Sequence, residues 1–292
     1  MKTPRLILML ALASTLAAAG EERPSAEYVD GAKTVSRFTK RLGKLVKAKT
    51  VVPMKILVKQ AQSYTAFPMT IPIPPKVSLS PEEIYASCCD SVVLVGAVYK
   101  CKKCRHWHPV SATGFALGDD GLIVTSRHVI STNPPKETLA IMTRDGRLFP
   151  VREVVASDPV NDLVILRTEA TGLRPLPVAA DIPVGAPVYA IHHATPNLYA
   201  FTQGTVIGKF MNAHDKQLLV RTLAISADYA SGSSGGPVLN EHGAVVGIIC
   251  AASPVFDHSN GSTNIATEMV WKYTVPSAVL LELTKSPRVS GP

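Results

Sequence analysis

The chain lacks several features that define large classes of proteins. Beyond the first 20 residues it has no apolar run long enough to span a bilayer. It shows no βαβ alternation of strands and helices, no solenoid repeat, and no basic stripe interleaved with aromatic residues. These absences argue against a multi-span membrane protein, a doubly wound α/β fold, a repeat protein and a nucleic-acid-binding protein. What remains has 46% hydrophobic residues, 19 glycines and 23 prolines, which is typical of a globular fold rich in turns.

The first 20 residues are typical of a secretory signal peptide. Lys2 and Arg5 precede an apolar run from Leu6 to Ala19 that ends in three alanines. The run is too short to span a bilayer comfortably, which disfavours a membrane anchor, and no cysteine follows it to carry a lipid. We therefore expect an exported protein, periplasmic or secreted. After cleavage roughly 270 residues remain, enough for one two-lobed domain or two ordinary ones.

The basic charge is concentrated in one segment. Residues 31 to 60 contain nine Lys or Arg and no acidic residue, whereas residues 61 to 292 contain 18 basic and 18 acidic side chains. Apolar residues recur at helical spacing until Pro53 ends the pattern; they are Val35, Phe38, Leu42, Leu45 and Val46. An amphipathic helix of this kind fits contact with an anionic surface, such as a membrane or a cell-wall polymer. A solvated pro-segment or tether is the plainer alternative.

After the basic segment the sequence changes character. Residues 60 to 80 hold four prolines and little charge, as an extended linker would, and Ser80-Pro81-Glu82-Glu83 has the composition of a capped helix start. From Ser91 onward, short runs of β-type residues alternate with turn residues, which predicts an all-β barrel or sandwich. The expected strands are 91–99, 114–117, 122–125, 138–143, 148–155, 163–167, 187–192, 203–210, 217–225, 237–239, 244–250 and 268–273, with an apolar helix at 276–283.

A serine among glycines is the strongest candidate for chemistry. Ser234 follows Gly232 and precedes Gly235 and Gly236, so it can sit on a sharp turn with its hydroxyl exposed. The same turn aims backbone N–H groups at one point, as an oxyanion hole requires. Turns of this composition are common, so the prediction depends on finding a base and a group that orients the base.

Both partners occur upstream. The apolar run 122–126 leads into His128, and Asp162 opens the apolar run 163–166. Either residue alone would more simply be structural, but together they complete the order His, Asp, Ser. α/β-Hydrolases run Ser, Asp, His and subtilisins run Asp, His, Ser, so the order argues against both classes. Asp158 is the competing carboxylate; Asp162 is preferred because it leads directly into the strand.

Five stretches share the residues of one known family: Thr113-Gly-Phe-Ala-Leu-Gly, Val124-Thr-Ser-Arg-His128-Val, Asp158-x-x-x-Asp162-Leu-Val-Ile-Leu, Gly232-Ser-Ser234-Gly-Gly-Pro and Val246-Gly-Ile. By these the chain resembles the trypsin-like serine proteases of chymotrypsin fold, nearest the bacterial HtrA/Deg branch. The resemblance implies a double six-stranded β-barrel with a C-terminal helix in a protease domain at residues 81–285. The first barrel would comprise residues 85 to about 170 and the second about 175 to 275, with the active site between them.

The resemblance also assigns roles. Ser234 would be the nucleophile, His128 the general base and then acid, and Asp162 the group that orients the imidazole. The N–H groups of Gly232 and Ser234 would hold the oxyanion, and no metal or cofactor would be required. The chain departs from the branch in leaving no room for a PDZ domain, and in carrying Arg127 and Ser233 where an uncharged residue and Asn are more usual.

Substrate binding is assigned by the same resemblance. Asp228 lies six residues before Ser234, the spacing at which trypsin keeps the acid of its S1 pocket, which implies cleavage after Arg or Lys. Nearby backbone amides are an equally simple partner for Asp228, because the loop lacks the disulfide that shapes this pocket in trypsin. Residues 249–252, including Cys250 and Ala251, would pair with an extended substrate as an added strand. Residues 253 to 267 are expected to form a polar loop at the pocket mouth.

Four of the five cysteines fall within 17 residues: Cys88, Cys89, Cys101 and Cys104. With His106 and His108 nearby, Cys101-x-x-Cys104 has the ligand types of a zinc site, but export favours disulfides and no second CxxC is present. Disulfides are the preferred prediction, and zinc stays open. Cys250 is expected to be a buried free thiol. The remaining histidines are expected at the surface or in loops; they are His192, His193, His214, His242 and His258.

Taken together, the residues predict an exported serine endopeptidase that hydrolyses protein or peptide substrates through an acyl-enzyme. The main alternative is a catalytically silent peptide-binding or scaffold protein on the same fold, although a complete triad counts against it. A third is an esterase that uses the same triad.

Overall fold

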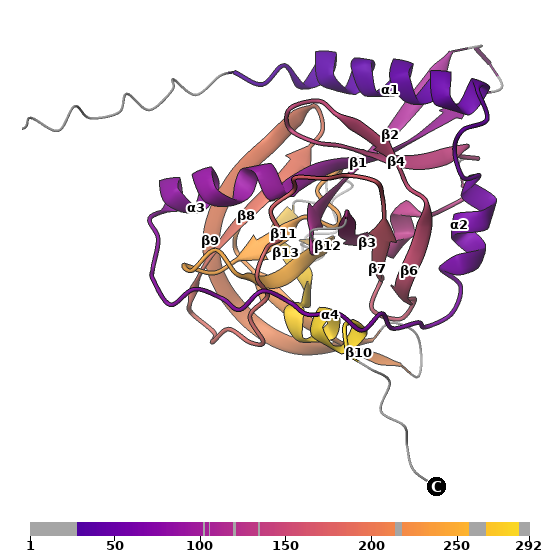
Figure 1. The fold of residues 1–292 in the computed structure, drawn as a ribbon. Coiled ribbons are helices and arrows are strands. Elements are labelled where there is room, and N and C mark those ends of the chain that lie inside the picture. The colour runs from indigo at the N-terminus through magenta and orange to yellow at the C-terminus, as the bar shows by residue number, and fades with distance from the viewer. Residues whose placement is uncertain are drawn as a thin grey trace, which may run out of the picture.

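The computed structural model describes residues 28–285 except 102, 105, 119–120, 134, 214–217 and 257–266. The predicted signal peptide at residues 1–20 lies outside the described residues, as do His214 and His258 and most of the expected loop at 253–267. Two curled antiparallel sheets form the body of the molecule, and four helices lie on its outside in this part of the chain (Figure 1). No helix among the described residues has the length and apolar character needed to cross a membrane.

The first lobe is a sheet of seven strands in the order β5-β4-β1-β2-β3-β7-β6. Alternate residues of β1 enter different cores: Val92 and Leu94 join the core shared between the lobes, whereas Val93 and Val95 fill the centre of this lobe. The strands are β1 (Val92–Lys100), β2 (Trp107–Ala116), β3 (Leu122–Ser126), β4 (Thr138–Met142), β5 (Leu148–Pro150), β6 (Glu153–Asp158) and β7 (Leu163–Arg167).

The strand count of this lobe differs from the expected six, because the run expected at 148–155 divides into β5 and β6. Pro150, which has no N–H to donate, ends β5. The next two residues then donate hydrogen bonds to two different strands. Val151 N–H donates to Leu139 O of β4 at 2.9 Å, and Arg152 N–H donates to Arg167 O of β7 at 2.9 Å. This corner brings β4 and β7 together and curls the sheet toward closure.

The second lobe is a closed six-stranded barrel, as expected, in the order β10-β13-β12-β11-β8-β9. Its centre holds apolar side chains such as Val188, Val206 and Leu223. The strands are β8 (Pro187–Ala194), β9 (Asn197–Ala213), β10 (Leu219–Ile225), β11 (Pro237–Leu239), β12 (Val245–Phe256) and β13 (Thr267–Pro276). The predicted C-terminal helix is α4 (Ser277–Leu283), which buries Val279, Leu280 and Leu283.

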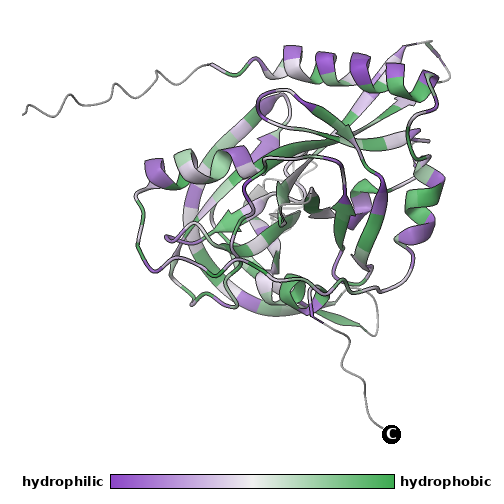
Figure 2. Ribbon diagram, in the orientation of Figure 1, coloured by the Kyte–Doolittle hydropathy of each residue, from purple (hydrophilic) through white to green (hydrophobic). Residues whose placement is uncertain are grey.

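The basic segment forms the predicted amphipathic helix, α1 (Gly31–Lys47), but its apolar face packs on the protein itself. Phe38 and Leu42 are buried in the shared core. Gly96 of β1 makes room for the Phe38 ring, since a Cβ there would lie 2.7 Å from it. Hydrophilic positions recur along the outside of the helix (Figure 2). The segment is therefore not a detached tether, and only its cationic side remains free for an anionic surface.

The stretch expected to be a linker is also bound to the body. After α2 (Met54–Gln60), a helix that the sequence analysis missed, it runs past α4 to α3 (Pro81–Cys88) (Figure 1). Thr65 pairs with Ser157 of β6, Phe67 N–H donates to Leu283 O at 2.8 Å, and Leu79 N–H donates to Glu241 O at 2.8 Å. The stretch thus spans both lobes. The predicted capping box at Ser80 is confirmed, because its Oγ accepts the Glu83 N–H and the Glu83 carboxylate accepts the Ser80 N–H.

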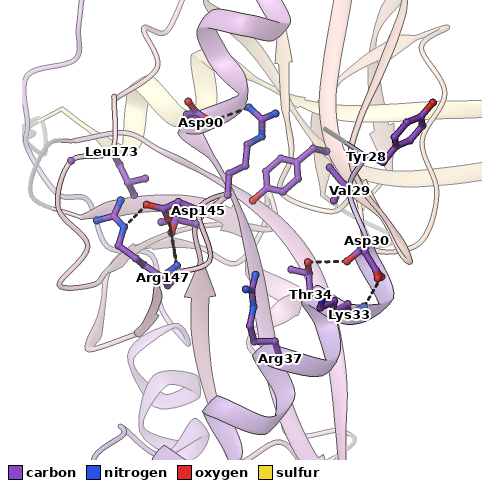
Figure 3. A pocket seen from close by; sticks show the side chains of 14 residues that line it. Tyr28, Val29, Asp30, Lys33, Thr34, Arg37, Asp90, Asp145, Arg147 and Leu173 are labelled. Atoms are coloured by element: carbon purple, nitrogen blue, oxygen red, sulfur yellow. Dashed lines mark hydrogen bonds and ion pairs between the residues drawn. The ribbon is translucent and has the colours of Figure 1, made fainter. Parts of the chain in front are cut away.

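A charged cavity of about 590 Å³ lies between the start of α1 and the β4–β5 turn (Figure 3). Its charges largely pair with one another, as Arg147 does with Asp145 at 2.7 Å and Arg144 with Asp90 at 3.2 Å. None of the residues that line it belongs to the predicted triad. The cavity reflects how α1 sits on the first lobe and is not the predicted active site.

Candidate active site

The loop that carries Ser234 connects β10 to β11 and depends on two glycines. Gly232 has φ +96° and Gly235 has φ +85°, in the region that favours glycine. A Cβ on Gly232 would lie 2.5 Å from His193 O, and one on Gly235 would lie 2.3 Å from Thr113 O. Neither position therefore accepts a side chain without movement of backbone.

Two N–H groups of this loop point to a common use. Ser233 N–H donates to Ala230 O, Gly235 N–H to Ile249 O, and Gly236 N–H to Ser233 O. The N–H groups of Gly232 and Ser234 have no acceptor within the described part of the chain. An oxyanion hole needs two unpaired N–H groups close to the nucleophile, and here one belongs to Ser234 itself and the other to the residue two positions before it.

Thr113 of β2 fixes this loop to the first lobe. Its N–H donates to Ser234 O at 2.9 Å, and its Oγ1 donates to Gly232 O at 2.9 Å. The same Oγ1 accepts the N–H of His193 at 2.9 Å, and Thr113 O accepts the Thr125 hydroxyl at 2.7 Å. Ser234 is thereby held near the end of β3, which lies two residues before His128.

His128 and Asp162 are joined by two hydrogen bonds. His128 lies in a short 3₁₀ turn, Arg127–Val129, directly after β3, and Asp162 lies directly before β7. Asp162 Oδ1 accepts the His128 N–H at 2.7 Å, and Oδ2 accepts Nδ1–H at 2.6 Å. With the proton on Nδ1, Nε2 carries a lone pair and is the basic nitrogen. The His128 side chain is 52% exposed and so faces the surface where substrate would arrive.

The geometry separates the two candidate carboxylates. Asp158 Oδ1 accepts the N–H groups of Val160 and Asn161, both at 3.0 Å, and Oδ2 accepts the Asn161 side chain at 2.6 Å. Asp158 thus builds the turn that precedes β7. Asp162 itself has φ +56°, a left-handed conformation that Asp tolerates better than most residues.

Cys250 contacts the same carboxylate. Its Sγ donates to Asp162 Oδ2 at 3.5 Å, and the thiol is half-buried. Burial, with the nearby Asp162 charge, raises the pKa of Cys250 to about 12, so it stays protonated and acts as a donor. The thiol is free, as predicted, but its contact with the carboxylate that holds His128 was not predicted.

Within the described part of the chain, the edge of β12 beside Ser234 is open. β11 pairs with β12 only between Val245 and Ile248, so the residues from Cys250 onward pair only with β13. Ala251 is exposed, and its carbonyl accepts the Tyr229 hydroxyl at 2.7 Å. An extended peptide can therefore add alongside this edge. The loop expected from Ser253 is in part wrong, because β12 continues to Phe256.

Asp228 does not form the base of an enclosed pocket. Its side chain is 89% exposed, and its carboxylate lies 3.7 Å from Lys272 Nζ. Lys272 in turn donates to Tyr229 O at 2.7 Å. An exposed acid beside a lysine is a poor receptor for a basic substrate side chain, so the geometry does not support the preference for Arg or Lys.

A second serine–histidine pair lies in the same loop, and the sequence analysis missed it. Ser233 is fully buried, and its Oγ lies 2.8 Å from His192 Nδ1. His192 Nε2 faces the carbonyl of Asp228 at 3.2 Å, which places the proton on Nε2 and makes Nδ1 the acceptor of the Ser233 hydroxyl. Burial lowers the pKa of His192.

His193 lies beside this pair at the boundary of the lobes and is also buried. Its Nδ1 accepts the N–H of Tyr199 at 3.0 Å, and burial lowers its pKa to about 3. The expectation that His192 and His193 lie at the surface was therefore wrong. Both belong to β8, where every residue from Val188 to His193 is buried because the strand faces its own barrel on one side and the first lobe on the other.

Among the described residues, Ser234 Oγ makes no hydrogen bond to a protein group. Its loop meets the end of β3, because a Cβ on Gly235 would lie 2.8 Å from Ser126 N, and Ile249 O accepts both the Gly235 N–H and the Ser126 hydroxyl. The loop of Ser234 and the strand end that leads into His128 therefore converge.

The expected disulfides do not form. All five cysteines are free thiols in the structure. Cys88 is buried near Gly243 of the second lobe, and Cys89 accepts a hydrogen bond from Arg144 at 2.9 Å. Cys88 and Cys89 thus lie apart from the other two cysteines. The sulfurs of Cys101 and Cys104 are 3.1 Å apart.

Comparisons found a family profile, curated relatives and solved structures to which this chain is similar. Residues 112–248 match the sequence profile of the trypsin-like peptidase domain. The mitochondrial serine protease HTRA2 of Drosophila grimshawi is 28% identical over 183 residues, which cover 57% of this chain and 41% of that protein. An uncharacterized protein of Sinorhizobium fredii is 32% identical over 143 residues, which cover 48% of this chain and 21% of that protein. The chain thus spans less than half the length of these relatives.

Solved structures show the same fold. The HtrA-type protease AlgW with a decapeptide superposes with a TM-score of 0.58 at 18% identity, covering 71% of this chain and 67% of that chain. A structure of AlgW with a tripeptide gives a TM-score of 0.55 at 20% identity, covering 70% of this chain and 62% of that chain. At this identity the superpositions show a shared fold, and the trypsin-like peptidase profile matches residues 112–248 of this chain.

Proposed function

We propose that this chain, which carries a trypsin-like peptidase domain with HtrA-type relatives, is a serine endopeptidase that uses Ser234, His128 and Asp162. The observation that carries the proposal is the pair of hydrogen bonds between Asp162 and His128. The carboxylate accepts the backbone N–H at 2.7 Å and the ring Nδ1–H at 2.6 Å. It fixes both the tautomer and the direction of the imidazole, which a general base requires.

In the acylation step, Ser234 Oγ attacks the carbonyl carbon of the scissile peptide bond. His128 Nε2 accepts the hydroxyl proton, and the carboxylate of Asp162 stabilises the imidazolium that results. The same proton then passes to the leaving amine as the C–N bond breaks, which leaves an acyl-enzyme on Ser234. Water, deprotonated by His128, hydrolyses this ester and restores the free serine.

The negative charge of the tetrahedral intermediate needs donors that are fixed in advance. The N–H groups of Gly232 and Ser234 fill this role, since neither has another acceptor in the described residues. Such a donor is worth about 10²- to 10³-fold in rate in comparable hydrolases. The glycine conformation at residue 232 is what allows both groups to face one oxyanion.

The substrate class follows from the open edge of β12. An extended backbone adds beside Cys250 and Ala251 by main-chain hydrogen bonds, which favours unfolded or flexible protein segments over small esters. AlgW, a structural relative, has been solved with bound peptides. We further propose that the protein works outside the cytoplasm, on the basis of the signal-peptide pattern of residues 1–20.

A fluorophosphonate probe tests the proposal. The probe reacts with an activated serine, so the wild-type protein should become labelled and should cleave quenched casein, whereas the Ser234→Ala variant should do neither. The Ser233→Ala variant is the matched control and should still label. If correctly folded wild-type protein neither labels nor cleaves, the proposal fails and the silent peptide-binding protein takes its place. Labelling with cleavage of esters but not of casein would favour the esterase.

A further inference from the structure

A cluster of metal-binding side chain types lies at the tip of the β1–β2 hairpin, away from the active site. Cys101, Cys104 and His108 bring their ligand atoms within 4.8 Å of one another. Cys104 Sγ lies 3.1 Å from Cys101 Sγ and 2.8 Å from His108 Nε2. Thr113, which meets the Ser234 loop, is five residues further along β2 than His108, which is about 17 Å of extended strand. The cluster therefore does not belong to the proposed catalytic machinery.

The hairpin holds these groups in place from two sides. The strands pair up to Lys100 and Trp107, so residues 101–106 form the connecting loop. His108 sits opposite Tyr99 and stacks on its ring, with 5.3 Å between the centroids, which fixes the plane of the imidazole. The Cys104 N–H donates to Cys101 Sγ at 3.1 Å. A hydrogen bond donated to sulfur favours the thiolate, which is the form of cysteine that binds a metal.

The imidazole decides between a disulfide and a metal. A disulfide would need the sulfurs about 2.0 Å apart, whereas two thiolates on a tetrahedral zinc lie roughly 3.7 Å apart, given Zn–S bonds of about 2.3 Å. The observed 3.1 Å lies between the two. A disulfide gives His108 no role, but its Nε2 points at Cys104 Sγ and completes a third ligand position.

We propose that this hairpin tip binds a structural Zn²⁺ ion through Cys101, Cys104 and His108, with His106 as the fourth ligand. His106 is an exposed residue of the connecting loop and lies outside the group of three ligand atoms; it is assigned as the fourth ligand because it is the one further Cys or His in the loop sequence 101–106. Two thiolates and two imidazoles suit zinc and not Mg²⁺ or Ca²⁺, which prefer oxygen ligands. As each Zn–S bond forms, the thiol proton passes to solvent, so binding releases up to two protons.

Charge and packing agree with a structural role. The loop sequence 101–106 carries three Lys or Arg residues and no acidic residue, a net charge that suits two thiolates. On the strand face opposite His108, Trp107 packs against α1, where a Cβ on Gly43 would lie 2.5 Å from the indole. The ion would thus hold the end of the hairpin in the shape that receives the basic helix.

Cobalt binding tests the proposal on the full-length Ser234→Ala protein, which cannot cleave itself if it is a protease. We expect the reduced, metal-free protein to bind one Co²⁺ per chain, with thiolate-to-cobalt absorption, and Zn²⁺ to displace it. Cys101→Ser and Cys104→Ser should weaken binding by at least 100-fold, and His108→Ala by at least tenfold. Cys88→Ser, which removes a buried cysteine outside the cluster, should bind as the parent does.

Tryptophan fluorescence gives a readout that does not depend on absorption by cobalt. The chain has two tryptophans, so Trp271→Phe leaves Trp107 as the reporter. Removal of zinc by a chelator should shift its emission to the red as the hairpin end loosens from α1, and added Zn²⁺ should reverse the shift.

Three results would overturn the proposal. The first is less than a tenth of an equivalent of Co²⁺ bound by reduced, folded protein, and the second is equal binding by the Cys101→Ser and Cys88→Ser variants. The third is a Cys101–Cys104 disulfide in protein that fails to bind Co²⁺ after reduction. Unchanged binding in His106→Ala would overturn the assignment of the fourth ligand. None of these readouts requires peptidase activity, so their failure is distinct from failure of the proposed function.

Discussion

Ser233 and Ser234 are neighbours in one loop, but the two histidines proposed or observed as their partners, His128 and His192, have opposite surroundings. His128 is half-exposed, and a carboxylate accepts its Nδ1–H, so its Nε2 is free and basic. His192 is buried, its Nε2 faces a backbone carbonyl, and its Nδ1 is already occupied by the Ser233 hydroxyl. A serine next to a histidine is therefore not sufficient for catalysis.

The two histidines differ in the charge beside the imidazole and in how far the ring is buried. Proton transfer needs a state in which imidazolium is stabilised, and Asp162 supplies the opposite charge for His128. His192 has only a carbonyl dipole, and burial lowers its pKa, so it resists protonation. The buried pair helps to hold the loop in shape, whereas His128 and Asp162 have the exposure and the charge that the proposed chemistry requires.

The largest test of this comparison is the loss of the exposed hydroxyl. Ser234→Ala should lower kcat by about 10⁶-fold, as removal of the nucleophile does in other triads, because no other group can form the acyl-enzyme. Its thermal midpoint should change little, because Ser234 Oγ has no protein partner in the described residues. Residual activity within 100-fold of wild type would show that Ser234 is not the nucleophile.

The next largest effect concerns the oxyanion donors. Gly232→Ala should lower kcat by about 10²- to 10³-fold, because the Cβ meets His193 O and turns the N–H away. Gly185→Ala is a matched control, since Gly185 also has a positive φ, +88°, but has no atom within 4 Å of the added Cβ. Both changes strain the backbone, and only the first should reduce the rate of casein cleavage.

Loss of the buried hydroxyl should affect stability instead. Ser233→Ala leaves His192 Nδ1 and the Ala230 N–H without their partner, at a cost of about 1–3 kcal/mol in the free energy of unfolding. Urea denaturation measures this cost. At temperatures where the variant is folded, kcat should stay within a few fold of wild type. A stability unchanged by the mutation would mean that the pair contributes nothing to the loop.

The smallest effect is in the acid dependence of folding. The unfolded pKa of histidine is about 6.5, whereas burial lowers that of His193 to about 3, so between these values the unfolded chain binds a proton that the native protein does not. This contribution to stability is present above pH 6.5 and is lost as the pH falls toward 3. Between pH 6.5 and 5.5 it amounts to about 1 kcal/mol.

His193→Gln should remove this part of the pH dependence. Glutamine keeps an acceptor for the Tyr199 N–H but does not titrate, so the variant should lose less stability than wild type over the same pH interval. Parallel curves for wild type and His193→Gln would contradict the assignment.

Local pattern was enough to place most of the strands and to predict that His128 and Asp162 lie together. Asp162 could be preferred over Asp158 because it leads into an apolar run, and Ser234 was marked by its glycines. The histidines of β8 could not be placed, because residues of opposite faces are both buried only when a second lobe covers the strand. That partner is not visible in the sequence of the strand itself.

The same limit explains the basic segment. The helical spacing of Phe38 and Leu42 correctly predicted an amphipathic helix, but not that its apolar face would meet Gly96 of β1. An apolar face requires a partner without specifying which one. The prediction of disulfides failed for a related reason. Cys88 and Cys101 are close in sequence, but the extended strand β1 lies between them and separates them in space.

Thr113 is one residue of the first lobe, and it makes three hydrogen bonds to the second: its N–H donates to Ser234 O, its hydroxyl donates to Gly232 O, and the same hydroxyl accepts the His193 N–H. These three contacts to the loop of Ser234 and to β8 therefore exist only while the lobes are docked, in addition to the bonds that the loop makes within its own lobe. Catalytic competence and lobe docking become a single cooperative property. In a gradual denaturation, peptidase activity should disappear at the first parting of the lobes, before either barrel melts.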